Sequence, residues 1–475
     1  MKICVLQPDY STSAVDYQYY DPARNLSHLL PDVEFDHVLL NKLTTYKQLL
    51  ELSKNGYDCF VNLCEGYLEW EVPSIDVIYT LELLNLPFTG PTTLLYDPPK
   101  ELMKYVAYTE GVATANYALI DSLHNLQQQV QHLSFPLFVK PAKAGDSLGI
   151  DDSSKVGSIE ELQEKAELLL KEYPQLLVEE FIAGREFTVL VAADAKDEKV
   201  CKVFQPIEFI FPRGKSFKTY SLKTSELHPE SNIPVTDSSI KQQLTEAAQR
   251  IFRSFGGVGY ARMDYRMDEK GTIYFLEVNF TCSVFYTDGY EGSADYIIKA
   301  DGIGQAGFLQ HIIDEGIARH KRLQKKYVMK GNSIAGFGIY ATQPIAAGEV
   351  IFKGEERPQR IVTKRYVEEN WLPEEKLLFK HYAVPLSSEV YVLWDNNPTE
   401  WAPQNHSCSP NTAYKGLNLV AIRQVSAGEE LTMDYSDLLN ESAETFDCQC
   451  GALGCRKKIT GTKGNSVTLR EQNNR

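Results

Sequence analysis

The chain has 475 residues, too many for a single hydrophobic core, so two to four domains are expected. Its composition, 43% hydrophobic and 24% charged, is that of an ordinary globular protein, and no run of eighteen or more apolar residues predicts a transmembrane helix. A formal net charge of −16 argues against broad binding to nucleic acid. It leaves two alternatives, a basic peptide as partner or a solvated acidic surface without one.

The chain opens with the apolar run Ile3–Leu6, which is too short for a signal peptide and is better interpreted as a buried strand. Five of the nine cysteines are scattered through the first 300 residues, and the other four follow Asn405. Scattered cysteines without paired spacings indicate reduced thiols, and therefore a cytoplasmic or, in a eukaryotic host, a nuclear location.

The first two thirds of the chain are predicted to be α/β. Helix-like segments such as Val77–Leu86 alternate with apolar runs over the first ninety residues. Pro98 and Pro99 interrupt this pattern, and Pro99 suits the start of a helix over Lys100–Glu110. Further strands are predicted at Leu137–Lys140, Leu176–Glu179, Phe187–Ala192, Val200–Phe204 and Ile273–Asn279, with helices at Ser158–Glu172 and Ile240–Phe255.

The last third of the chain has a different pattern. The charged segment His320–Lys326 is predicted to be a linker. Beyond it, short strands separated by glycines are expected at Ile334–Ala341, Val350–Lys353 and Leu417–Ile422, which indicates a compact β-rich domain. The end, 462–475, is expected to fray.

Two segments of the α/β part suit nucleotide binding. Lys140 ends an apolar strand and precedes the glycine-containing loop Ala144–Gly149, whose backbone N–H groups suit an anion, although an ordinary turn is the alternative. The segment Val178–Thr188 is a strand, a turn and a strand with three acids. The backbone beside Glu180 and Phe181 could bond an adenine edge, although acids at a strand end are more often simply solvated.

Polar and apolar residues alternate in Arg262–Asp264 and Glu277–Asn279, so the polar members of each strand share one face. Two carboxylates and an amide oxygen on such a face form the hard, oxygen-rich site that Mg²⁺ prefers. The alternative is a structural salt bridge through Arg262.

Together, and in this order, these residues resemble the D-alanine–D-alanine ligase branch of the ATP-grasp superfamily over roughly residues 1–310. The resemblance implies an α/β ATP-grasp fold of three subdomains that uses ATP and magnesium to join a carboxylate to an amine. It implies that Arg262 stabilises the tetrahedral transition state and that Asp264, Glu277 and Asn279 hold magnesium. It also implies nucleotide contacts by Lys100, Lys140 and Lys223 (phosphates), by Glu179, Glu180, Phe181 and Ile182 (adenine), and by Glu186 (ribose).

Two segments depart from the ligase pattern. Phe280–Phe285 stands where the family usually has a Met-Pro-Gly segment that helps to hold the second substrate. Gln7–Ser11 stands where the family has a glycine-rich segment with a glutamate that reads the amine of the first D-alanine. We therefore expect an amino acid other than D-alanine, or a peptide, as the acceptor.

The β-rich part carries three signals. Gly336 and Gly338 flank Phe337, which suits a close approach of the backbone to a ligand, although a β-turn is the stronger alternative. Asn405 and His406 offer donors and acceptors to a polar ligand, or form a capped turn. Tyr435 ends a predicted strand, where its hydroxyl could orient an amine. The cysteines Cys448, Cys450 and Cys455 supply three thiolates for zinc, and Cys408 is the natural fourth ligand.

This set resembles the SET domain with its post-SET zinc segment, over about residues 327–460. The resemblance implies transfer of a methyl group from S-adenosylmethionine to the ε-amine of a lysine, with Tyr435 orienting the neutral amine. It implies that Gly336, Phe337, Gly338, Asn405 and His406 bind the cofactor. The segment between Lys353 and Pro403 matches no pattern, so the target lysine, on a histone or another protein or peptide, stays open.

The sequence thus predicts a protein lysine methyltransferase fused to an ATP-dependent carboxylate–amine ligase-like part. The alternative is an active methyltransferase whose ATP-grasp half only binds a nucleotide or a peptide. The predicted boundaries are 1–95 and 96–318 for the ATP-grasp subdomains, 319–326 for the linker, 327–440 for the SET domain, 441–462 for the zinc segment and 463–475 for a flexible tail. No membrane contact and no direct nucleic-acid partner are expected.

Overall fold

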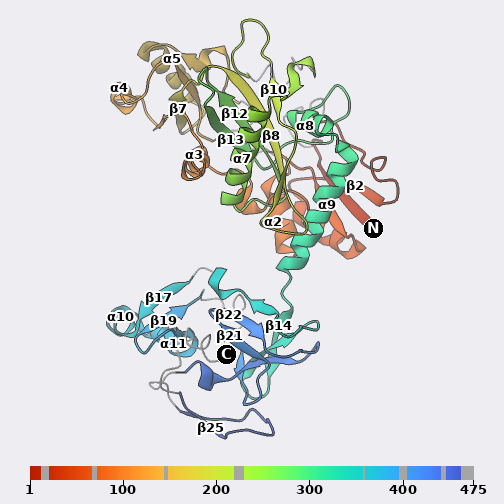
Figure 1. Cartoon of the computed structure of the whole chain (residues 1–475), viewed down its shortest axis with the longest axis vertical. Helices are drawn as coiled ribbons and strands as arrows, with labels where there is room; N and C mark the ends of the chain where they lie inside the picture. Colours follow the sequence, from red (N-terminus) through yellow and green to blue (C-terminus); the bar gives the residue numbers. More distant parts are fainter. Residues whose placement is uncertain are drawn as a thin grey trace. The chain divides into compact units, whose positions relative to one another are not determined.

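A computed structural model describes residues 1–11, 21–66, 72–143, 148–218, 229–356, 359–394, 404–439 and 445–461. The chain divides into two compact units, Met1–Leu323 and Gln324–Arg475 (Figure 1). Within the described ranges, no helix is both long and apolar enough to cross a membrane.

The first sheet of the first unit is parallel, with β1 (Lys2–Pro8) between β2 (Glu34–Leu40) and β3 (Cys59–Asn62). Because helices cover both faces, β1 is buried along nearly its whole length and reads as a continuous apolar run. On one face lie α1 (Thr45–Leu52) and α2 (Ile75–Leu83), and on the other lies α9 (Gly304–Leu323).

The second sheet has the order β4-β7-β5-β6, with antiparallel pairing throughout. The helices α4 (Leu126–Gln129) and α5 (Ile159–Leu169) pack on its apolar face. The side chain of Ser158 caps α5 by accepting a hydrogen bond from the Glu161 N–H. The strands are β4 (Tyr117–Ile120), β5 (Leu137–Pro141), β6 (Lys155–Val156) and β7 (Leu176–Glu180).

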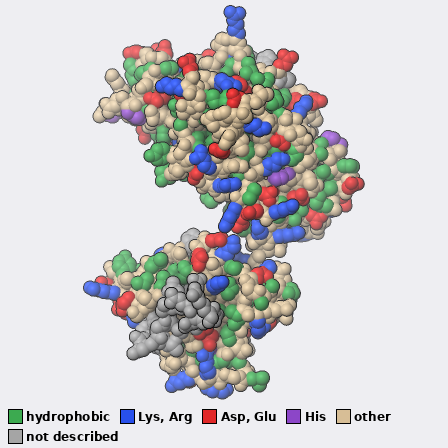
Figure 2. Space-filling view, in the orientation of Figure 1, with side chains coloured by type: hydrophobic (Ala, Val, Ile, Leu, Met, Phe, Trp, Pro, Cys, Tyr) green, Lys and Arg blue, Asp and Glu red, His purple; other side chains and the backbone are tan. Residues whose placement is uncertain are grey.

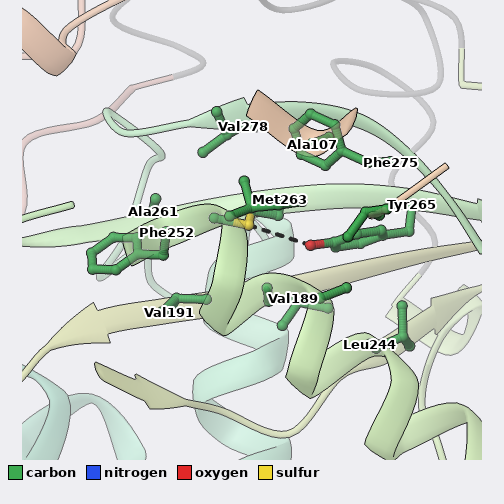
Figure 3. Close-up of a cluster of buried hydrophobic side chains, with 14 of the residues drawn as sticks. Ala107, Val189, Val191, Leu244, Phe252, Ala261, Met263, Tyr265, Phe275 and Val278 are labelled. Carbon is green, nitrogen blue, oxygen red and sulfur yellow. Dashed lines mark hydrogen bonds between the residues drawn. The ribbon is translucent and has the colours of Figure 1, made fainter. Parts of the chain in front are cut away.

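The third sheet is the largest, with the order β11-β10-β8-β12-β13 and with β9 paired to β8. Its core is closed by α3 (Lys100–Thr109) and α7 (Ser238–Ser254), which contribute Ala107, Leu244 and Phe252 to the cluster in Figure 3. Within that cluster the Tyr265 hydroxyl donates to the Met263 sulfur at 3.4 Å. The strands are β8 (Arg185–Ala193), β9 (Cys201–Val203), β10 (Ile207–Phe209), β11 (Asn232–Pro234), β12 (Tyr260–Met267) and β13 (Ile273–Asn279), and α8 (Ser293–Asp301) follows them.

The segment predicted as a charged linker, 319–326, is partly helical, because α9 continues to Leu323. Arg319 lies on the inner face of this helix, and its guanidinium donates to the carbonyl oxygens of Phe88 (2.6 Å) and Gly90 (2.9 Å). It thereby satisfies backbone acceptors that are buried beneath the helix.

The second unit consists mainly of short strands in small sheets, ordered β14-β15-β23-β20, β16-β22-β21, β17-β19-β18 and β24-β25. Two helices, α10 (Lys364–Asn370) and α11 (Pro373–Tyr382), lie between β17 and β18 in the chain. The strands are β14 (Tyr327–Asn332), β15 (Gly336–Ala341), β16 (Val350–Phe352), β17 (Arg360–Thr363), β18 (Val384–Pro385), β19 (Val390–Leu393), β20 (Asn405–His406), β21 (Thr412–Lys415), β22 (Asn418–Ala421), β23 (Glu430–Met433), β24 (Phe446–Asp447) and β25 (Lys458–Ile459).

Single turns of 3₁₀ helix complete both units, at Ser53–Asn55, Thr93–Leu95, Asp152–Ser154, Pro229–Ser231, Gly354–Glu356 and Tyr435–Asp437. The apolar clusters of the second unit are small compared with those of the first: one surrounds Ile339 and Leu431, and the other surrounds Phe352 and Trp394. Acidic and basic side chains are interspersed on the visible face of each unit (Figure 2).

Candidate functional site

A buried cluster of lysines surrounds Glu179 in the first unit. From β5, Lys140 places its Nζ 2.6 Å from Oε1 of Glu179 on β7, and Lys104 of α3 places its Nζ 2.6 Å from Oε2. Lys100, one turn earlier on α3, is also buried. Burial alone would raise the pKa of Glu179, but the two ammonium groups outweigh it and lower this pKa to about 2. The charge of Glu277 also acts on all three lysines, so three cations face the two carboxylates of Glu179 and Glu277. An excess of positive charge suits an anion.

A cavity lies beside this cluster and has an aromatic wall. The rings of Phe138 and Phe217 are 5.1 Å apart between centroids, and Phe181 lies 6.1 Å from Phe217. Such a wall suits a flat heteroaromatic ring. The predicted residues that line the cavity are Lys100, Lys140, Glu179, Glu180, Phe181, Ile182, Glu186, Asp264 and Glu277.

In the segment Glu180–Ile182, at the end of β7, some backbone and side-chain groups already have hydrogen-bond partners within the protein. The N–H of Glu180 donates to the carbonyl oxygen of Asn116 (3.0 Å) and that of Phe181 to the carbonyl oxygen of Pro136 (2.9 Å). The Glu180 carboxylate accepts hydrogen bonds from Asn116 and from the Ser134 N–H. The carbonyl of Glu180 and the N–H of Ile182 are therefore the backbone groups that would meet a ligand edge.

The acidic strand pair also lines the cavity, through Asp264 and Glu277. In the β12–β13 register Asp264 stands opposite Glu277, and Arg262 stands opposite Asn279. Nη2 of Arg262 lies 3.3 Å from the Asp264 carboxylate, as expected for the alternative salt bridge. Arg262 and Asn279 are the next pair along these strands and lie outside the cavity lining. The oxygens of Asp264, Glu277 and Asn279 make a donor set that fits a magnesium ion.

The predicted phosphate contact Lys223 and the loop residues 144–147 lie outside the described part of the chain. The preceding residues Phe217 and Lys218 are described, and both line the cavity. The Lys218 ammonium lies 3.1 Å from the Glu186 carboxylate.

In the second unit, β20 and β23 bring Asn405, His406 and Tyr435 together. The two strands are parallel neighbours, and Tyr435 follows β23 by two residues. The Tyr435 N–H donates to Nδ1 of His406 at 3.1 Å, and the Tyr435 hydroxyl donates to the carbonyl oxygen of Gln404 at 2.8 Å. Burial, with Tyr382 and Glu430 nearby, raises the pKa of Tyr435 to about 12, so its phenol stays protonated at neutral pH.

The glycines of β15 differ in what requires them: the backbone conformation favours glycine at 336, and the Glu430 carboxylate would have to move to admit a side chain at 338. Gly336 has a φ of +82°, and a Cβ on Gly338 would lie 2.3 Å from Oε1 of Glu430. Asn405 donates to the Phe337 carbonyl oxygen at 2.7 Å and to Glu430 at 2.8 Å. The structure therefore brings Gly336–Gly338 and Asn405 into one site.

The four C-terminal cysteines gather around Cys448. Its sulfur lies 3.8 Å from that of Cys408, whose N–H donates to the Cys450 sulfur, and the Cys455 sulfur lies 3.7 Å from the Cys448 carbonyl oxygen. Ligand atoms of His406, Cys408, Cys448 and Cys450 all lie within 4.8 Å of one another. All nine cysteines of the chain are free thiols. Soft thiolates in this arrangement fit a zinc ion.

Two protein families match the chain. Residues 106–287 match the family model described as D-ala D-ala ligase C-terminus, and residues 336–436 match that described as SET domain. The chain joins a ligase-like module to a SET domain. Its first unit thus has an ATP-grasp-like α/β fold, and a β-rich SET region follows, as the sequence predicted.

Among curated proteins, the chain is similar to the D-alanine–D-alanine ligase of Streptococcus uberis (31% identical over 206 residues, 42% of this chain and 57% of that protein). It is likewise similar to the ligase of Aquifex aeolicus (31% over 201 residues, 42% and 64%). The chain thus spans about three fifths of the length of these relatives.

Among solved structures, the D-alanine–D-alanine ligase of Bacillus anthracis complexed with ATP matches with a TM-score of 0.50 and 19% identity. It covers 68% of this chain and 100% of that one. The D-alanine–D-alanine ligase of Coxiella burnetii gives a TM-score of 0.50 and 18% identity, covering 68% and 97%. These likenesses show the fold.

Sequence reasoning missed two cations of the ligase-like module. Lys104 lies four residues after Lys100, so both point from the same face of α3. Arg266 lies two residues after Asp264 on β12, lines the cavity and donates to the Ser216 carbonyl oxygen at 2.5 Å. Helical and strand spacing from the residues already chosen would have found both.

Proposed function

We propose that the SET domain is an S-adenosylmethionine-dependent protein lysine methyltransferase and that the ligase-like module activates a carboxylate with ATP and magnesium. The methyltransferase half rests on one observation: three neighbouring strands, β15, β23 and β20, bring the Gly336–Gly338 segment to Asn405 and bring the Tyr435 phenol to the carbonyl of the adjacent Gln404. S-adenosylmethionine, when bound, supplies the methyl group.

In this proposal Tyr435 positions the amine of the substrate lysine. Its hydroxyl is held by the Gln404 carbonyl at 2.8 Å and stays protonated, so its oxygen lone pairs can accept a hydrogen bond from the amine. A lysine is nucleophilic only when neutral, and the half-buried aromatic rings of Tyr435 and Phe446 disfavour its charged form. Fixed orientation of the amine supplies the rest of the advantage.

His406 supports both the phenol and the sulfur cluster. Since Nδ1 accepts the Tyr435 N–H, the ring proton sits on Nε2, which faces the Cys408 sulfur at 3.4 Å. His406 therefore acts as a donor to a thiolate, and Cys408, Cys448, Cys450 and Cys455 are the four zinc ligands in this proposal. Burial lowers the pKa of His406, which favours this neutral form.

In the ligase-like module, Lys100, Lys104 and Lys140 hold the phosphates, and the ring wall of the cavity holds the adenine. The carboxylates Asp264 and Glu277 with Asn279 hold magnesium, and Arg262 stabilises negative charge at the reacting carboxylate. ATP supplies the phosphoryl group that activates the carboxylate.

The first test measures methyl transfer from radiolabelled S-adenosylmethionine to histones and to lysate proteins. Tyr435→Phe is expected to lower the rate by about 10²- to 10³-fold, the usual loss for one positioned hydrogen-bonding group. Equal incorporation by both proteins, or none by the unaltered protein, would refute the methyltransferase assignment.

The second test measures binding of magnesium-ATP by titration calorimetry. The unaltered chain is expected to bind it and Asp264→Ala to bind it much more weakly, whereas absence of binding to the unaltered chain refutes the ligase assignment.

A second candidate for the ligase-like module is a binding scaffold without turnover. One observation favours it: Glu186, the predicted ribose contact, lies 3.1 Å from Lys218 and 3.9 Å from Arg266, so a nucleotide must compete with these cations. ADP release that depends on an added acceptor would exclude the scaffold.

A further inference from the structure

A hydrogen-bonded network in the second unit joins four strands, and its centre is the Glu430 carboxylate at the start of β23. Oε1 of Glu430 accepts hydrogen bonds from Nδ2 of Asn332 at 2.9 Å and from Nδ2 of Asn405 at 2.8 Å. The same oxygen lies so close to Gly338 that a Cβ there would be 2.3 Å away. One carboxylate thus connects β14, β15, β20 and β23.

The end of β14 fixes Glu430 in place. Oδ1 of Asn332 accepts hydrogen bonds from the N–H groups of Ile334 (2.8 Å) and Ala335 (3.0 Å). Because those groups can only donate, the Asn332 amide takes one orientation, with Nδ2 toward Glu430 and toward the Tyr340 hydroxyl at 3.1 Å. The turn between β14 and β15 therefore determines where the carboxylate lies.

The Asn405 amide is oriented in the same way. Its Nδ2 donates to the carbonyl oxygen of Phe337 at 2.7 Å as well as to Glu430. Both partners can only accept, so both N–H bonds of Nδ2 are used and Oδ1 is the polar atom that remains. None of the described residues donates to this oxygen. Since Asn405 is half-buried, Oδ1 can accept a hydrogen bond from a ligand.

Glu430 also brings a negative charge that no neighbouring cation balances. Its two hydrogen-bond donors are neutral amides, and no lysine, arginine or histidine among the described residues forms an ion pair with it. The preceding acid differs, because the Glu429 carboxylate lies 2.6 Å from Nη2 of Arg423. Glu430 is half-buried, so water and salt screen its charge incompletely. An unbalanced carboxylate in this position favours a cationic ligand.

The network is connected to the phenol of Tyr435 by short links. Tyr435 follows the end of β23 by two residues, and Glu430 is the first residue of that strand. Asn405 is next in the chain to Gln404, whose carbonyl oxygen accepts a hydrogen bond from the Tyr435 hydroxyl at 2.8 Å. Glu430 and the phenol therefore contact two successive residues of the chain.

We propose that Glu430 is a positioning residue of the methyl-donor site, which orients Oδ1 of Asn405 toward the cofactor and makes the site prefer the cationic cofactor to its neutral product. This inference rests on the proposed methyltransferase activity. Methyl transfer breaks the bond between the methyl carbon and sulfur and forms one between that carbon and the lysine nitrogen. The positive charge passes from sulfur to nitrogen, and S-adenosylhomocysteine, with a neutral thioether, is left. Since the rest of the two molecules is the same, the ratio of their affinities reports the charge at sulfur.

The test measures the Kd values of S-adenosylmethionine and S-adenosylhomocysteine for the full chain by titration calorimetry, without a methyl acceptor. Glu430→Gln keeps the size of the side chain and removes its charge. It is expected to raise the Kd of S-adenosylmethionine about three- to tenfold more than that of S-adenosylhomocysteine, the effect of one charge at a half-buried site. Glu430→Asp keeps the charge on a shorter side chain, so it should weaken both ligands and leave the ratio of their Kd values unchanged.

The matched control is Glu429→Gln, which removes the neighbouring charge that is already paired with Arg423 and should leave the ratio unchanged. If the unaltered chain binds neither ligand, the proposed methyltransferase function itself is overturned. If it binds them, an unchanged ratio in Glu430→Gln, or an equal change in Glu429→Gln or Glu430→Asp, overturns the role of Glu430. Should Glu430→Gln fail to fold, Asn332→Lys decides, because it brings a cation to the carboxylate and should shift the ratio in the same direction.

Discussion

The two units position their polar groups by different means. In the ligase-like module, long strands and α3 hold Lys104, Lys140 and Glu179 inside a large apolar body, where two ion pairs of 2.6 Å balance the charge. In the SET domain the described apolar clusters are small, and a histidine and three cysteines, whose ligand atoms lie within 4.8 Å of one another, join short strands and turns. The first site therefore depends on buried charge balance, and the second depends on its sulfur cluster.

The largest expected effect is on the SET domain. Cys448→Ser, or removal of metal by a chelator, should abolish its thermal transition and its methyl transfer and leave the transition of the ligase-like module in place. The reason is that structural zinc contributes about 10–16 kcal/mol in small domains that lack a large core. Calorimetry of the full chain measures both transitions, and the exposed Glu369→Gln on α10 is the matched control. If the thermal transitions of both units shifted equally, the SET domain would not depend on its sulfur cluster more than the ligase-like module does.

The corresponding change in the ligase-like module is Glu179→Gln. It keeps the shape of the side chain but leaves Lys104 and Lys140 buried without their counter-ion, which should cost about 3–5 kcal/mol of the free energy of unfolding. Denaturant unfolding measures it. Glu164→Gln, on the exposed face of α5, should stay within about 0.5 kcal/mol. If Glu164→Gln lost as much free energy of unfolding as Glu179→Gln, the loss of the buried ion pairs would not explain the effect.

Acid should lower the stability of the ligase-like module through the Glu179 carboxylate. The pKa of Glu179 is lowered from 4.5 to about 2 by its lysines, against the opposing effect of burial. The unfolded chain therefore binds a proton before the folded one does. The contribution of this carboxylate is complete above about pH 5 and is lost as the pH falls towards 2, a loss of about 3 kcal/mol. Unfolding curves of the ligase-like module over this range measure it, and Glu179→Gln should flatten the profile.

The smallest expected effects are at helix N-termini, one in each unit. The Asp237 side chain accepts hydrogen bonds from the N–H groups of Ser239 and Ile240 at the start of α7, and Thr363 accepts one from Tyr366 at the start of α10. Asp237→Ala and Thr363→Ala should each cost about 1 kcal/mol, and only in the transition of the unit that holds the helix. A loss that appeared in both transitions would mean that the units unfold together.

Many residues that line the cavity of the first unit could be chosen from the sequence, because they lie on regular elements. Alternation along β12 and β13 put the polar residues of each strand on one face, and an apolar run put Lys140 at a strand end. Local periodicity determines such positions. The pairing of Asp264 with Glu277 and the contact of Lys140 with Glu179 come from the order of the strands in the sheets.

The contacts of Ser283 with Glu65 and of Arg24 with Val284 could not be predicted, because 218 and 260 positions separate these residues in the chain. No periodic pattern links residues that only the packing of α8, α9 and β1 brings together. For the same reason the inward turn of Arg319 was not foreseen. The boundary between the two units, after Leu323, falls within the predicted linker 319–326.

The imidazole of His406 has a consequence for how the SET domain responds to oxidants. One edge of the ring is bonded to the backbone of Tyr435, and the other faces the Cys408 sulfur. A peroxide that oxidises this thiolate removes the acceptor on one edge of the ring and, at the same time, one of the four proposed zinc ligands. Methyl transfer and the thermal transition of the SET domain should therefore be lost at the same dose of oxidant.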